Sequence, residues 1–182
     1  MQIQDGLGSG LLAGVDHDNR LQTSARVNER IFYVSKDEGE AYSIFTTWTM
    51  TAGLISLYVR NDHDTANFVI QEIHSYSADA DVVFKLWQLT GTPAGTLVIP
   101  MTLNLTKAKT ANLTCYGGAS VTGLTLPTTP LWQWHNGVAK SNVKIDLVDC
   151  LIIGKGGAVG IEYDAGTGTA GSMLTIFGYF DV

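Results

Sequence analysis

Basic residues are scarce in this sequence. Lys and Arg together account for 11 of the 182 residues, and no stretch of the chain clusters them. Proteins that bind nucleic acid directly rely on basic patches that release counterions, so we expect no direct nucleic-acid partner. No apolar run approaches the roughly 18 residues of a membrane-spanning helix. Because no basic segment followed by an apolar one opens the chain, we also expect no secretory signal and no membrane partner.

Cysteine is scarce as well, with only Cys115 and Cys150 present. In a protein without a secretory signal, two isolated cysteines are typical of buried free thiols. A disulfide or a metal pair is the alternative. Zinc would need two further ligands at a recognisable spacing, and the sequence contains no such set.

Motifs for cofactors and catalysis are also missing. GLGSGLLA, residues 6–13, matches a loose dinucleotide-binding pattern, but too little sequence precedes it to form the required strand. No G-x-S-x-G nucleophile elbow surrounds any serine. We therefore expect no cofactor and no enzymatic activity.

Two Asp-His-Asp triplets, at residues 16–18 and 62–64, raise the question of a metal site. A calcium loop starting at Asp16 would need Gly at its sixth position and Glu at its twelfth, which here are Leu21 and Val27. We interpret both triplets as polar loop tips. Metal binding by either triplet remains the alternative.

Short runs with alternating apolar residues dominate the rest of the chain. Thr and Gly are abundant, which is typical of β structure. Turn signals such as Asn61-Asp62, Gly117-Gly118 and Asn136-Gly137 separate the runs. About ten short strands predict an all-β fold, an antiparallel β-sandwich or jelly roll, in which the connections from 104 to 130 are long and one of them crosses between sheets. The clearest runs are 41–50, 53–60, 67–74, 82–89, 143–148, 158–163 and 172–180.

The first 30 residues differ in composition from the rest. They are rich in Gly, Asp, Asn, Gln and Arg and contain few aromatics, so alone they could not bury enough surface to order themselves. Thirty extended residues can reach about 100 Å, far enough to cross onto a neighbouring subunit. We therefore predict an N-terminal assembly arm at 1–30 and a β-sandwich domain at 31–182.

Two tryptophans two positions apart form another candidate site. On a strand, Trp132 and Trp134 would face the same side, with His135 and Asn136 nearby as polar partners. Exposed indoles could stack on sugar rings. The alternative is that they fill the core or a subunit interface, where Trp is common.

The two ends of the chain resemble small virion structural proteins of tailed bacteriophages. That family often begins with I-x-D-G, a glycine-rich stretch and an apolar-Asp-x-x-Asn-Arg-Leu element, as in IQDGLGSGLLAGVDHDNRL. The C-terminal third, LIIGKGGAVGIEYDAGTGTAGSMLTIFGYFDV, resembles the family's closing strands, which end in Tyr-Phe-Asp. The matching residues are Ile3, Asp5, Gly6, Gly8, Gly10, Val15, Asp16, Asn19, Arg20 and Leu21, and then Tyr179, Phe180 and Asp181.

The resemblance covers about half of the chain and implies a capsid decoration protein that is assembled in the host cytoplasm and located on the virion. Its expected partners are further copies of itself, as a homo-oligomer and by resemblance a trimer, together with the major capsid protein or other virion proteins. Glycines would let the arm lie flat on a neighbour, while Asp16, Asn19 and Arg20 would supply directional hydrogen bonds. The alternatives are a neck, tail or baseplate component, and a carbohydrate- or receptor-binding module that uses the Trp132 region.

Overall fold

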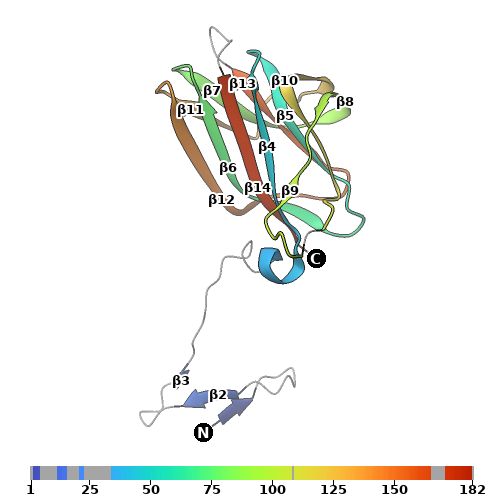
Figure 1. Ribbon diagram of the computed structural model, residues 1–182, viewed down its shortest axis with the longest axis vertical. Coiled ribbons are helices and arrows are strands. Elements are labelled where there is room, and N and C mark those ends of the chain that lie inside the picture. Colours follow the sequence, from blue (N-terminus) through green and yellow to red (C-terminus); the bar gives the residue numbers. More distant parts are fainter. Residues whose placement is uncertain are drawn as a thin grey trace.

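Two antiparallel sheets form the body of the protein (Figure 1). The computed structural model describes residues 2–4, 12–15, 21–22, 34–107, 109–164 and 171–181. The six-stranded sheet has the order β11-β7-β13-β5-β10-β8, and the five-stranded sheet has the order β12-β6-β14-β4-β9. The strands are β4 (Ala41–Thr49), β5 (Leu54–Asn61), β6 (Asn67–Ser77), β7 (Val82–Gln88), β8 (Thr90–Leu97), β9 (Met101–Thr102), β10 (Leu113–Thr125), β11 (Trp132–Asn136), β12 (Ser141–Ile153), β13 (Ala158–Asp164) and β14 (Gly171–Asp181).

The order of the strands is that of a jelly roll. Successive strands alternate between the two sheets from β4 to β7, and again from β11 to β14. The set β12-β6-β14-β4 therefore faces the set β11-β7-β13-β5, which gives the two four-stranded layers of a jelly roll. Strands β8, β9 and β10 lie between β7 and β11 in the chain and extend one side of each sheet. The prediction of an all-β sandwich is confirmed.

Inward-facing side chains of the two sheets form the main core. On β12, Leu147 is buried, whereas Lys144 and Asp146 are exposed, as the alternation of this run predicted. Each fully buried large apolar side chain contributes roughly 1.5–3 kcal/mol relative to an exposed one. The largest buried side chains of this core are Tyr42, Phe68, Phe84, Tyr163 and Phe180.

A second buried cluster lies on the outer face of the six-stranded sheet, where Ile55, Tyr58 and Trp87 pack with Val121 of β10. Regular alternation along the run 53–60 would place Ile55 on the same face as Leu57, but Leu57 lies in the main core and Ile55 does not. The pairing of β13 with β5 skips one residue between them, so the side chain of Ile55 points to the opposite side.

A third cluster lies at the foot of the outer face of the five-stranded sheet. Ala41, Val69 and Tyr179 point outward there and are covered by Val34, so that all four are at most 3% exposed. Val34 begins η1 (Val34–Glu38), a single π-helical turn just before β4. The chain entering the sandwich therefore covers the foot of this face.

As predicted, the chain crosses between the sheets in the region 104–130, from β9 in the five-stranded sheet to β10 in the six-stranded sheet. The connections there are shorter than predicted, because the region contains the 13-residue strand β10. Its register against β5 shifts between Gly117 and Val121, and such a bulge breaks the regular alternation by which a strand is recognised. The predicted turn at Gly117-Gly118 is this bulge. In the N-terminal region, β1 (Gln2–Gln4), β2 (Leu12–Val15) and β3 (Leu21–Gln22) form a separate antiparallel sheet.

Candidate assembly surface

The chain crosses from one sheet to the other between β8 and β9. This crossing segment, Leu97–Met101, leaves the edge of the six-stranded sheet and joins the edge of the five-stranded sheet, where Met101 pairs with Ser43. The N–H of Val98 donates to the carbonyl oxygen of Cys115 at 2.9 Å, and its side chain packs against the main core. Because the chain is extended, the side chains on either side of Val98 point away from the core.

Three large aliphatic side chains of the crossing segment are therefore open to solvent. Leu97 is 63% exposed, Ile99 72% and Met101 58%. Phe45 and Trp48 of the neighbouring strand β4 are each almost half exposed. These five side chains, called the apolar patch below, expose on the order of 500 Å² together, which is near the upper end for the largest apolar patch of a typical monomer.

Two glycines of β10 allow the strand to approach this region closely. A Cβ on Gly117 would lie 2.7 Å from Thr46 Oγ1 and 2.9 Å from a methyl group of Val98. Gly118 has a φ of +133°, and the indole of Trp48 lies beside it. Larger residues here would push β4 and the crossing segment away from β10.

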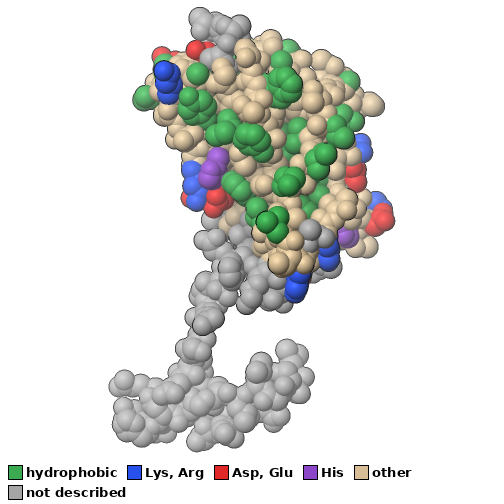
Figure 2. Space-filling view, viewed as in Figure 1, with side chains coloured by type: hydrophobic (Ala, Val, Ile, Leu, Met, Phe, Trp, Pro, Cys, Tyr) green, Lys and Arg blue, Asp and Glu red, His purple; other side chains and the backbone are tan. Residues whose placement is uncertain are grey.

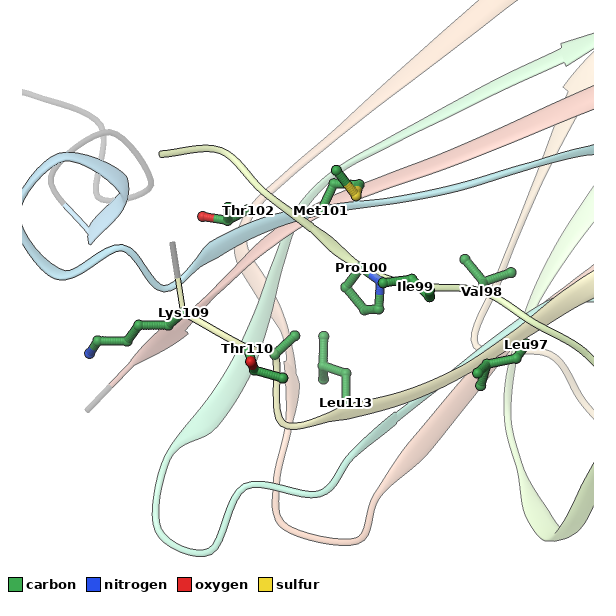
Figure 3. A pocket seen from close by; sticks show the side chains of 10 residues that line it. Leu97, Val98, Ile99, Pro100, Met101, Thr102, Lys109, Thr110 and Leu113 are labelled. Atoms are coloured by element: carbon green, nitrogen blue, oxygen red, sulfur yellow. The ribbon is translucent and has the colours of Figure 1, made fainter. Parts of the chain in front are cut away.

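The crossing segment forms a ridge between two hollows. One hollow, of about 400 Å³, lies between the ridge and residues 109–113, including Thr110 and Leu113 (Figure 3). The other, of about 470 Å³, lies between the ridge and β4 and is lined by Phe45 and Trp48. Lys109 is the one charged residue in the lining of the first hollow, and the lining of the second contains none.

Charged side chains gather at the margin of this face. Figure 2 shows hydrophobic side chains spread over the face, with charged ones toward its edges. On β6 and β12, Lys144 Nζ lies 3.0 Å from Glu72 and 2.9 Å from Asp146, and His74 Nε2 lies 2.9 Å from Glu72. Partial burial acts to raise the pKa of Glu72, but the hydrogen bonds from His74 and Lys144 outweigh it and lower that pKa. The cluster contains both signs of charge.

The two predicted tryptophans have different environments. The indole of Trp134 is 9% exposed, stacks on Phe84 with ring centroids 5.6 Å apart, and donates from Nε1 to Ser75 Oγ at 2.9 Å. Trp132 is 53% exposed. Of the two alternatives, the core position describes Trp134, so the two indoles cannot form one exposed platform.

The polar residues beside the tryptophans also divide. Asn136 is 1% exposed and donates from its amide to the carbonyl oxygen of Ser141 at 3.1 Å. His135 is exposed, with Nε2 3.7 Å from Asp81. Trp132 and His135 are therefore the only accessible members of the predicted set of four side chains.

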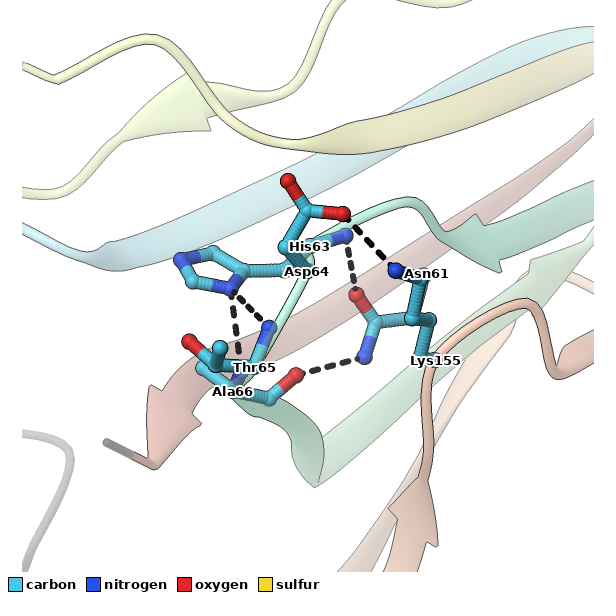
Figure 4. A network of polar contacts seen from close by, with 6 residues as sticks. All are labelled: Asn61, His63, Asp64, Thr65, Ala66 and Lys155. Atoms are coloured by element: carbon cyan, nitrogen blue, oxygen red, sulfur yellow. Dashed lines mark hydrogen bonds and ion pairs between the residues drawn. The ribbon is translucent and has the colours of Figure 1, made fainter.

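The triplet at residues 62–64 forms a hydrogen-bonded turn (Figure 4). The buried amide of Asn61 donates to the carbonyl oxygens of Ala66 and Ile153, at 2.9 and 2.8 Å, and accepts from the N–H of His63 at 2.8 Å. His63 Nδ1 accepts from the N–H of Ala66 at 2.9 Å. Asp64 pairs with Lys155 at 2.8 Å, which lowers the pKa of Asp64. These contacts explain the triplet as a turn.

A buried carboxylate lies on the outer face of the six-stranded sheet. Glu162 is 7% exposed and accepts from Trp87 Nε1 at 2.6 Å. Lys85 Nζ lies 3.6 Å from Glu162 and 2.6 Å from Asp164. The hydrogen bond to Asp164 raises the pKa of Lys85 despite partial burial. This network satisfies the charge of Glu162 within the sheet.

The predicted arm is described only in part. Ile3 lies in β1 opposite Ala13, and Leu21 lies in β3 opposite Val15. The remaining predicted arm residues lie outside the described residues, as does the triplet at 16–18: Asp5, Gly6, Gly8, Gly10, Asp16, Asn19 and Arg20.

Of the two cysteines, Cys115 is a buried free thiol. Burial, with a smaller contribution from Asp62, raises the pKa of this thiol to about 12. The side chain of Cys150 lies outside the described residues.

Known proteins do not supply an assignment for this arrangement. No protein-family model, curated protein or solved structure matches the chain. In the part of the chain that the structure describes, no helix is long and apolar enough to cross a membrane. Within the same residues, no three His, Cys, Asp or Glu side chains lie together as metal ligands would.

The apolar patch has no clear signature in the sequence. In LVIPM, residues 97–101, every residue is apolar, so the pattern cannot distinguish Val98, which is partly buried against the core, from the exposed Ile99. The only available signal was Pro100, which is unusual within a central strand and indicates an edge or a crossing.

Proposed function

We propose that this chain is a structural virion protein of a tailed bacteriophage and that it decorates the capsid as a homo-oligomer. The apolar patch carries the proposal, because an exposed apolar patch near the upper end of the range for monomers is often a functional contact surface. The resemblance of the two chain ends to phage virion proteins supports the virion as the setting. The proposal includes no catalytic step.

The jelly roll agrees with this role but does not decide it. Viral capsid proteins and lectins both use this fold, so function has to be argued from the surfaces. Two surface features of the described residues bear on function: the apolar patch of about 500 Å² and the paired charges on β6 and β12. Both features suit association with another protein.

Counting copies on purified particles tests the proposal. Quantitative mass spectrometry of virions produced by cells that carry this sequence should find the protein in many copies, in a fixed ratio to the major capsid protein. A few copies per particle would indicate the neck, tail or baseplate alternative. Its absence from particles would refute the proposal.

Deletion of residues 2–22 tests the role of the arm. We expect the shortened protein to keep the circular dichroism spectrum of a folded β protein but to be lost from particles. Incorporation at the wild-type level would contradict the predicted arm.

The carbohydrate- or receptor-binding alternative now depends on Trp132, since Trp134 is buried. Under that alternative, Trp132→Ala would abolish binding on a glycan array while leaving assembly intact. Under the proposed function, the wild-type protein should bind no glycan on the array.

A further inference from the structure

We infer that a second copy of this chain covers the apolar patch, with the ridge of each copy lying in the hollow beside β4 of the other. The inference rests on the proposed function, because it names the partner of one surface of an assembling protein. Four properties of the described residues carry it: the covered foot of the same face, the shape, the charge and the area.

At the foot of the outer face of the five-stranded sheet, apolar residues that point outward are covered by another part of the chain. There, Val34 reduces the exposure of Tyr179 to 3%. Two residues along β14, Phe177 points to the same side and lies opposite Ser43, which in turn pairs with Met101 of the patch. The covered foot and the open patch thus lie on adjoining rows of one surface, and no element of the described chain covers the patch.

The shape of the surface is self-complementary. The ridge projects Leu97, Ile99 and Met101, and the adjacent hollow lies between this ridge and Phe45 and Trp48 of β4. A two-fold rotation places the ridge of each copy in the hollow beside β4 of the other copy. One contact therefore fills this hollow in both copies. Ile99, at the centre of the ridge, becomes the central buried residue.

The local charge permits two copies to meet here. The whole chain carries a formal charge of −6, which opposes association of identical copies in general. The hollow beside β4 has no charged residue in its lining, and on the far strands β6 and β12 of the same sheet Lys144 pairs with Glu72 and Asp146. Like-charge repulsion is therefore weak where this hollow meets another copy, whereas a strongly basic or acidic partner would find no complementary charge in its lining.

The area is sufficient for a stable contact. Two copies of the patch together contribute on the order of 1,000 Å² of apolar surface, to which the surrounding rim adds. Specific interfaces bury about 1,200–2,000 Å² in total. A symmetric contact centred on the patch and including its rim reaches that range.

Sedimentation velocity and native mass spectrometry of the full chain over a range of concentrations test the inference. We expect the wild type to form dimers. Ile99→Glu places a charge at the centre of the contact and should raise the dissociation constant at least about 100-fold. Val138→Glu is the matched control, since Val138 is similarly exposed, at 67%, but lies in the turn between β11 and β12; this variant should dimerise like the wild type.

Each other outcome overturns the inference. The inference is wrong if the wild type is monomeric or forms only trimers. It is also wrong if the Ile99→Glu variant dimerises like the wild type. Leu97→Glu, at the end of the ridge, should act in the same direction as Ile99→Glu, and thermal unfolding of both variants at equal concentration verifies that they fold. A monomeric protein that is nevertheless abundant on virions would overturn this inference and leave the proposed function standing. A dimer that depends on Ile99, formed by a protein that is absent from virions, would support this inference and refute the proposed function.

Discussion

Replacing each of the two tryptophans of β11 gives a sharp test of the structure, because they lie two residues apart on the same strand. Trp134 is 9% exposed, stacks on Phe84 and donates a hydrogen bond to the buried Ser75. Trp132 is 53% exposed. The same substitution, Trp to Ala, should therefore have very different consequences at the two positions.

We expect Trp134→Ala to lower the free energy of unfolding by about 3–5 kcal/mol, the usual cost of removing a buried aromatic side chain. Part of this loss is the hydrogen bond to Ser75, which contributes about 1 kcal/mol. Trp134→Phe keeps the ring stacking and should lose less than Trp134→Ala. Trp132→Ala should cost less than about 1 kcal/mol, as is usual for an exposed position.

Urea unfolding followed by circular dichroism measures all three variants, because tryptophan fluorescence would change with the substitutions themselves. The variants are best compared in the Ile99→Glu background, so that self-association does not make the stability depend on concentration. Equal losses for Trp132→Ala and Trp134→Ala, or a larger loss for Trp132→Ala, would refute the assignment of Trp134 to the core.

Three further predictions concern single buried positions. Asn61→Asp keeps the side-chain size but replaces a donor to two carbonyl oxygens by an anion. It should lower the free energy of unfolding by at least about 3 kcal/mol at pH 7, and by less as the pH falls to about 4, where the carboxyl is protonated. A urea midpoint equal to that of the wild type at pH 7 would contradict this. Gly178→Ala would place a Cβ 2.5 Å from Phe68 and should cost about 1–3 kcal/mol, whereas Gly171→Ala, with open space around it, should be neutral within about 0.5 kcal/mol in the same urea assay. With its pKa raised to about 12, Cys115 should resist iodoacetamide at pH 8 until urea unfolds the protein, as peptide mass spectrometry would show; rapid alkylation of the native protein would disprove its burial.

Regular alternation made most strands predictable from the sequence. In β12, apolar residues at 143, 145 and 147 alternate with polar ones, and the strand lies at the sheet edge with its polar side exposed, so one pattern encodes both strand and face. The pattern failed where the backbone departs from regular pleating. The skipped residue in β5 reverses Ile55, and the bulge at Gly117 hides β10, because both shift the two-residue period.

The candidate surface could not be predicted for a different reason. A sequence pattern separates polar from apolar positions, but both Val98 and Ile99 are apolar, and only the path of the chain between the sheets decides which of them packs against the core. The tryptophans of β11 show the same limit. Their spacing correctly places both on one side of a strand, but Trp132 is at the beginning of an edge strand, where the opposite sheet no longer covers it.

Folding of a single chain explains why position 98 carries an apolar side chain, but not why position 99 does. Val98 packs against the main core, so its apolar character stabilises the folded monomer. Ile99 is 72% exposed, and a polar residue there would fold equally well and be more soluble. The same holds for Leu97 and Met101, so three positions of one short segment carry apolar side chains that the isolated monomer does not use. Burial against another molecule accounts for all three, because each Å² of apolar surface removed from water stabilises the complex by about 25 cal/mol.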